Sequence, residues 1–275
     1  MNIVVCVKHV PDLQGERRFT GTGRVDREGA DGTLNELDEN AVEAALRLVE
    51  AHGGDVTVLT MGPDDAEDAV RRGLQMGAHR AVRVTDDALA GSDAFATARV
   101  LAAAVRRLAA DAPVDLVVTG MAALDGLMSV VPTLLAAELD LPQLTLAAEL
   151  ELLPGGAGGA ADGGASRPVL RVRRELDHVV EVLEAPLPAV VSVTDQANEA
   201  RYPAFAGIMA ARRASVDVWT VGDLGLDPAD LGDAGARTRV LEAAERPARE
   251  GVLVTDTGDA GVRLAAFLAE NGLLA

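Results

Sequence analysis

Residues 114–143 read VDLVVTGMAALDGLMSVVPTLLAAELDLPQ, and this stretch decides the predicted fold. Val114–Thr119 is a short β-branched run, long enough for one buried strand. Gly120 ends it, a loop with Asp125-Gly126 follows, and the apolar run Val130–Leu139 has helical spacing. A strand, a glycine-containing loop and a helix place backbone N–H groups beside a bound phosphate. An ordinary βα turn explains the stretch at least as well, because the chain has neither GxGxxG nor the Walker loop.

The chain before this stretch repeats the same order of strand and helix. Strands are predicted at 2–7, 55–61 and 80–85, and helices at about 35–52, 64–77 and 95–108. Asn35 or Asp38 can cap the first helix, and Gly53-Gly54 stops it. Four β–α units in series predict an α/β fold with a doubly wound, mostly parallel sheet.

After Pro142 the pattern changes to one of strands. Runs at 144–153, 168–176, 178–183 and 188–193 predict an added antiparallel or mixed portion beside the parallel sheet. Residues 195–221 are turn-rich, and a loop this long is more often functional than idle. Thr238–Glu242 is expected to be a short strand and Asp259–Asn271 a helix, in an extended C-terminal arm.

Composition and charge exclude several classes of function. The formal net charge of −18 opposes the binding of nucleic acid and of anionic membrane surfaces. The single cysteine, Cys6, excludes an intrachain disulfide. The sequence shows no secretory signal pattern and no run of about 18 apolar residues, so we expect a cytoplasmic protein without direct membrane insertion.

No catalytic constellation stands out in the sequence. The four histidines show no ligand spacing, so no metal site is predicted, and neither GxSxG nor HExxH occurs. Cys6 lies within a predicted central strand, where a buried inert thiol is favoured over a nucleophile. We therefore expect no catalytic residues and a chain that is not an enzyme on its own.

A series of motifs resembles the beta subunit of electron transfer flavoproteins. They follow the family's order over Met1 to about Leu226, and the last is the most specific: NIVVCVKHVPD, LNELDENAVEAA, MGP, LQMGAHRA, the DG loop ending in LPQ, PAVVSV and NEARYPAFAGIMAARR. The resemblance implies a nucleotide fold of the adenine-nucleotide alpha hydrolase-like type. It also implies a nucleotide-binding domain at 1–195, followed at 196–275 by a partner-recognition loop and an arm that packs on the alpha subunit.

The resemblance further implies an electron carrier of fatty acid oxidation. In the family, a heterodimer holds one FAD mainly in the alpha subunit and passes electrons from acyl-CoA and related dehydrogenases to a quinone oxidoreductase. The beta subunit buries an AMP. Carried over, that site places these residues around the cofactors: Cys6, Asn35, Leu37, Asp38 and Met61 at the adenosine, Gly120, Met121, Asp125, Gly126, Ser129, Val130 and Val131 in the phosphate loop, and Leu13 near the flavin edge.

The phosphate loop departs from the family pattern. Many members read DGDTGQVG, whereas this chain reads DGLMSVV, one residue shorter and apolar where the family has a polar pair. AMP is favoured, and the second FAD of electron-bifurcating relatives is the alternative. An ATP-binding sensor of the same fold and a free-standing flavin enzyme are further alternatives, the latter disfavoured by the missing dinucleotide fingerprint.

The segment Tyr202–Arg213 resembles the family's partner-recognition loop. Phe205 matches the apolar anchor that enters a dehydrogenase pocket, and Tyr202, Ile208 and Met209 accompany it as partner-binding residues. The alternative is that Phe205 packs on the chain's own core. The flanking proline and glycine favour exposure.

Overall fold

The computed structural model describes residues 1–275 except 13–14, 16–17, 28–30, 156–166, 245–246, 248–250, 252, 254 and 275. Leu13 therefore lies outside the described residues. The chain forms two compact units, Met1–Leu241 and Glu242–Ala275. The functional division expected at residue 195 stays a prediction.

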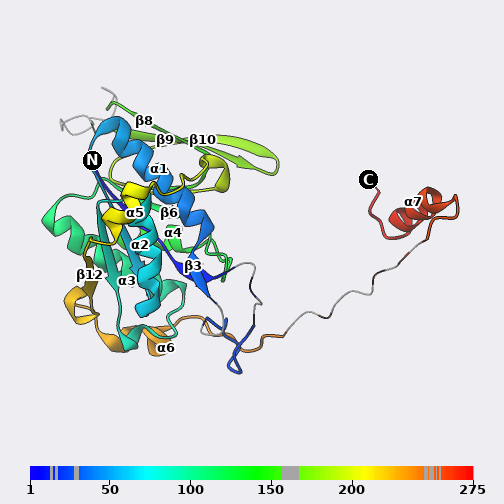
Figure 1. The fold of residues 1–275 in the computed structure, drawn as a ribbon, viewed down its shortest axis with the longest axis horizontal. Coiled ribbons are helices and arrows are strands. Elements are labelled where there is room, and N and C mark those ends of the chain that lie inside the picture. Colours follow the sequence, from blue (N-terminus) through cyan, green and yellow to red (C-terminus); the bar gives the residue numbers. More distant parts are fainter. Residues whose placement is uncertain are drawn as a thin grey trace. The chain divides into compact units, whose positions relative to one another are not determined.

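A seven-stranded parallel sheet forms the centre of the first unit (Figure 1). Every neighbouring pair of strands runs parallel, in the order β12-β5-β4-β1-β6-β11-β7. The strands span Asn2–Cys6 (β1), Asp55–Met61 (β4), Arg80–Val84 (β5), Leu116–Gly120 (β6), Gln143–Ala147 (β7), Ala189–Val193 (β11) and Val216–Trp219 (β12). The predicted parallel α/β fold is confirmed.

Helices cover both faces of this sheet, because side chains of a strand point alternately to opposite faces. Val5 packs in the core beneath one set of helices, whereas its neighbour Val4 packs in the core beneath the other. The first set is α1 (Glu36–His52), α2 (Glu67–Met76) and α5 (Phe205–Ala211), and the second is α3 (Ala94–Asp111) and α4 (Val131–Leu139). Gly53, with φ of 76°, ends α1 as expected.

The added antiparallel portion is a separate sheet in the order β10-β9-β8. Its strands are Glu149–Leu153 (β8), Val169–Leu176 (β9) and Val179–Pro186 (β10). The run at 188–193, which the sequence groups with this portion, is instead β11, between β6 and β7 of the parallel sheet. The single strand predicted at 144–153 is wrong, because it divides into β7 and β8, which belong to different sheets. A hairpin of β2 (His9–Pro11) and β3 (Gly32–Leu34) joins the end of β1 to α1.

Short helical turns fill most of the remaining connections. They are η1 (Asp64–Ala66), η2 (Asp87–Leu89), η3 (Asp195–Ala197), η4 (Gly222–Leu224), η5 (Pro228–Asp230) and α6 (Gly232–Gly235). The strand predicted at 238–242 is wrong. The N–H groups of Arg237 and Thr238 bond the Asp93 carboxylate, at 2.7 and 2.8 Å, instead of a neighbouring strand.

The second unit contains α7 (Ala260–Glu270), which confirms the helix expected near the C-terminus. Within the described ranges of the chain, no helix combines the length and apolar character needed to span a bilayer.

Candidate functional site

The carboxyl ends of β1 and β6 mark the place where the order of the strands reverses. From β1 the chain proceeds to β4 on one side, whereas β6 lies on the other side of β1. In open parallel sheets, ligands bind beside the carboxyl ends of strands at such a point. Lys8 follows β1 and Gly120 ends β6, so both lie at this edge.

Asp38 joins these two strand ends. Its Oδ2 accepts the backbone N–H of Lys8 at 2.8 Å, and its Oδ1 accepts that of Gly120 at 3.1 Å. Burial raises the pKa of Asp38 to about 7, although the two N–H groups oppose this rise by stabilising the carboxylate. A Cβ at Gly120 would lie 2.5 Å from Oδ1 of Asp38 and 2.8 Å from the carbonyl carbon of Leu37. Only glycine fits there.

Asn35 fixes the path of the loop after β6. Its Nδ2 donates to the carbonyl of Ala122 at 2.9 Å, and its Oδ1 accepts the N–H of Leu124 at 3.0 Å. Asn35 occupies the N-cap position of α1, but its side chain makes no capping bond to that helix. Asn35 and Asp38 thus shape the loop from within the core, and their contact with an adenosine stays a prediction.

The carboxylate of Asp125, within the loop after β6, binds two cations. Its carboxylate, 2% exposed, contacts Nζ of Lys8 at 2.8 Å and Nη2 of Arg27 at 2.5 Å. Burial alone would raise the pKa of Asp125, but the charges and hydrogen bonds of Lys8 and Arg27 outweigh it and hold the pKa below its usual range. Lys8 could have been singled out as the chain's one lysine, whereas the irregular sequence around Arg27 gave no signal.

After Asp125 the loop is open to solvent as far as Ser129. Gly126, Leu127, Met128 and Ser129 are exposed, and Leu127 and Ser129 have left-handed φ angles of 52° and 53°. Met61, Met121, Val130 and Val131 are half-buried.

The loop leads into an uncapped helix. No side chain within the described part of the molecule caps the start of α4 at Val130. An uncapped helix N-terminus with the cations Lys8 and Arg27 bound to the same loop fits an anionic phosphate.

Cys6 and Leu37 are buried near the same edge. Burial, aided by the negative charge of Asp38, raises the pKa of the Cys6 thiol to about 12. The thiol is therefore protonated at neutral pH. The expected burial of Cys6 is confirmed, and its lack of reactivity and its contact with an adenosine stay predictions.

The aromatic residues of the segment 202–213 face solvent. Tyr202 is 89% exposed and Phe205 is 79% exposed, while Ile208 and Met209 are half-buried. The Phe205 ring therefore does not pack in this chain's own core. Binding of a partner by these four residues stays a prediction.

Helix α5 is fixed on α2 by close packing. A Cβ at Gly207 would lie 2.4 Å from the carbonyl oxygen of Gln75, and Arg71 donates to the carbonyl of Ala211 at 3.2 Å. Phe205 is the first residue of α5, and the side of α5 that carries Gly207 and Ala211 packs on α2. The sequence also gave no sign that Arg201 binds Glu43 and Glu50 of α1.

Comparison with known proteins gives one consistent result. The model of the electron transfer flavoprotein domain matches residues 22–224. The electron transfer flavoprotein subunit beta of Mycobacterium leprae is 40% identical over 280 residues, covering 99% of each chain. The subunit of the same name from Megasphaera elsdenii is 35% identical over 94% of this chain and 93% of its own, and protein FixA of Azorhizobium caulinodans is 39% identical over 86% and 80%.

Proposed function

Because the chain belongs to the electron transfer flavoprotein family, we propose that it is the beta subunit of a heterodimeric electron carrier. It binds AMP at the strand reversal and shares one FAD with an alpha subunit. The observation that carries the nucleotide assignment is the loop at 120–131, shaped by Asn35 and Asp38 and followed by the uncapped start of α4.

The residues of this chain have distinct tasks in that role. FAD, when bound, supplies the redox chemistry of the heterodimer. Asp38 and Asn35 hold the loop in place, backbone N–H groups at Val130 and Val131 bind the AMP phosphate, and Lys8 and Arg27 add positive charge beside it. The net negative charge of the chain does not prevent binding of the phosphate, because the nearby backbone N–H groups carry the partial positive charge that binds an anion.

The electron donor is an acyl-CoA or related dehydrogenase, and a quinone oxidoreductase is the acceptor. The exposed Phe205 supports a docking contact, since a buried aromatic anchor contributes much of an interface's binding energy. An ATP sensor of this fold has no use for such an anchor. The arm after Leu241 packs on the alpha subunit, since α7 exposes Val262, Leu264 and Phe267, and a lone helix of this length is marginal in water.

Phe205→Ala tests the docking assignment. The variant heterodimer is expected to bind the dehydrogenase about 2 kcal/mol more weakly, roughly thirtyfold, with unchanged flavin content. The measurement is the rate of flavin reduction by a purified acyl-CoA dehydrogenase at increasing heterodimer concentration. Phe19→Ala, which removes another exposed phenylalanine, is the matched control. Equal reduction kinetics in Phe205→Ala and the parent would overturn the docking assignment.

A second FAD in place of AMP is the alternative for the nucleotide. The observation that favours this alternative is the exposed apolar pair Leu127 and Met128, at positions where many family members have polar residues in the phosphate loop.

A further inference from the structure

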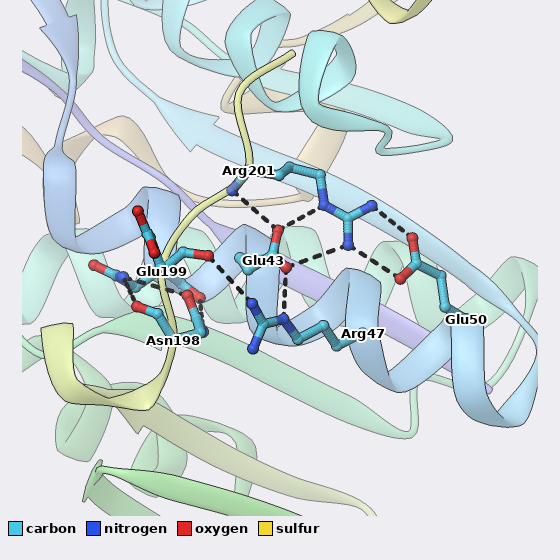
Figure 2. Close-up of polar contacts among 7 residues, drawn as sticks. Glu43, Arg47, Glu50, Asn198, Glu199 and Arg201 are labelled. Carbon is cyan, nitrogen blue, oxygen red and sulfur yellow. Dashed lines mark hydrogen bonds and ion pairs between the residues drawn. The ribbon is translucent and has the colours of Figure 1, made fainter. Parts of the chain in front are cut away.

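Arg201, directly before Tyr202, is bound to two carboxylates of α1 (Figure 2). Its Nε donates to Glu43 at 2.6 Å, and its two Nη atoms donate to both oxygens of Glu50, at 2.5 and 3.0 Å. Glu43 and Glu50 are seven residues apart, two turns of one helix face. The planar guanidinium thus spans two turns of α1, in the forked geometry that lysine does not provide.

Further bonds fasten the residues before Arg201 to the same helix. Arg47 bonds Glu43 at 2.6 Å and the carbonyl of Glu199 at 3.2 Å. Asn40 and Asn198 exchange hydrogen bonds, each side-chain amide donating to the other residue's carbonyl, at 2.8 and 3.0 Å. We call these contacts of residues 198–201 with α1 the α1 clasp.

The α1 clasp is built around a buried charge. The Glu43 side chain is only 3% exposed. Burial alone would raise its pKa, but hydrogen bonds from Arg201 and Arg47 outweigh this and lower the pKa below its usual value. Glu43 is therefore ionised at neutral pH, and loss of Arg201 leaves a buried carboxylate with one cation fewer.

The α1 clasp and the packing of α5 on α2 hold the two ends of a very short span. Only residues 202–204 lie between Arg201 and the start of α5, and Pro203 fixes one of their φ angles. Tyr202 and Phe205 are therefore exposed on a backbone that is anchored on both sides. An exposed anchor on a loose loop would lose conformational freedom on docking, and an anchored one loses less.

We propose that Arg201 is a positioning residue for docking, which holds Tyr202 and Phe205 ready for the partner by fastening the segment to α1. The inference rests on the proposed docking function. A merely structural role for Arg201 would lower thermal stability without changing the docking kinetics.

The test compares Arg201→Ala, Glu50→Gln and Arg171→Ala in the complete heterodimer. Glu50 is a half-exposed surface residue, so Glu50→Gln keeps the test informative should Arg201→Ala fail to fold. Arg171 also joins two glutamates, Glu151 and Glu184, but on the antiparallel sheet, and is the matched control.

Two measurements are made on each variant. Hydrogen exchange of the backbone amides at 199–202 is expected to accelerate about tenfold in Arg201→Ala and less in Glu50→Gln. The KM of a purified acyl-CoA dehydrogenase for the heterodimer is expected to rise about tenfold in Arg201→Ala, with kcat unchanged. Arg171→Ala should change neither quantity.

The outcomes separate this inference from the docking assignment. Unchanged exchange at 199–202 overturns the positioning role. A KM raised by Phe205→Ala but not by Arg201→Ala also overturns it, while docking through Phe205 stands. A KM that Phe205→Ala leaves unchanged overturns the docking assignment and the positioning role together.

Discussion

Replacing Asp38 with asparagine should change how the stability of the chain depends on pH. Asp38 is buried at the junction of β1, β6 and α1, and burial raises its pKa from 3.8 to about 7. Between these two values the folded chain binds the proton more tightly than the unfolded chain does. The contribution of Asp38 to stability is therefore largest at low pH and is lost as the pH rises towards and through 7.

The size of the effect follows from the same two pKa values. Full ionisation of Asp38 costs about 4 kcal/mol of folding free energy, and about 3 kcal/mol of this falls between pH 5 and pH 8. Glu43 and Asp125, whose pKa values are lowered, act in the opposite direction and only at more acidic pH. The asparagine side chain of Asp38→Asn would leave one of the two N–H groups without an acceptor, at a cost of about 1–3 kcal/mol that does not depend on pH.

The assay is urea unfolding of the nucleotide-free chain at pH 5, 6, 7 and 8, for the parent and Asp38→Asn. The fluorescence of Trp219, the chain's one tryptophan, reports unfolding, since its ring is buried and 4.5 Å from the guanidinium of Arg107. The stability of Asp38→Asn relative to the parent should rise by about 3 kcal/mol from pH 5 to pH 8. A stability difference between the two proteins that stays constant over this range refutes the reasoning.

Three further substitutions test the loop itself, and one of them is a control. Gly120→Ala should destabilise the chain by about 1–3 kcal/mol, because its Cβ would overlap Oδ1 of Asp38, whereas Gly126→Ala, with open space around the Cβ, should change stability little in the same urea titration. Asp125→Asn should cost about 1–3 kcal/mol at pH 7, since it removes the charge that Lys8 and Arg27 bind. The parent's advantage over Asp125→Asn should be lost as the pH falls through the lowered pKa of Asp125, and an equal cost at pH 2.5 and pH 7 contradicts this.

Local sequence patterns predict β1, β4, β5 and β6 of the central sheet, but they group β7 and β11 with the added portion. The strand at Asp55–Met61 has the bounds that its β-branched run and the flanking glycines indicate. The run at 144–153 looks continuous, yet Leu146 adopts a left-handed φ of 62° and the chain leaves one sheet for another at Ala148. The expected strand at 238–242 is absent because Asp93, far away in sequence, binds the N–H groups of Arg237 and Thr238. Such long-range competition is not visible in a local pattern.

The candidate site is only partly predictable for a similar reason. Asn35 or Asp38 is expected from the sequence to cap α1. Instead, the Asn35 side chain binds the loop after β6, and the Asp38 carboxylate binds Lys8 after β1 and Gly120 at the end of β6. The resemblance pointed to the loop at 120–131 and to the exposed Phe205. It did not find Arg27 or Arg201, because a single arginine in an irregular segment acquires its partner only when the chain folds.

Identification of the bound nucleotides tests the central claim most directly. The chain would be co-expressed with its alpha subunit, and the purified complex would be denatured and its released nucleotides separated by chromatography and quantified. One FAD and one AMP per heterodimer are predicted. Two FAD and no AMP, or a lone homodimer that releases ATP or nothing, would contradict the account.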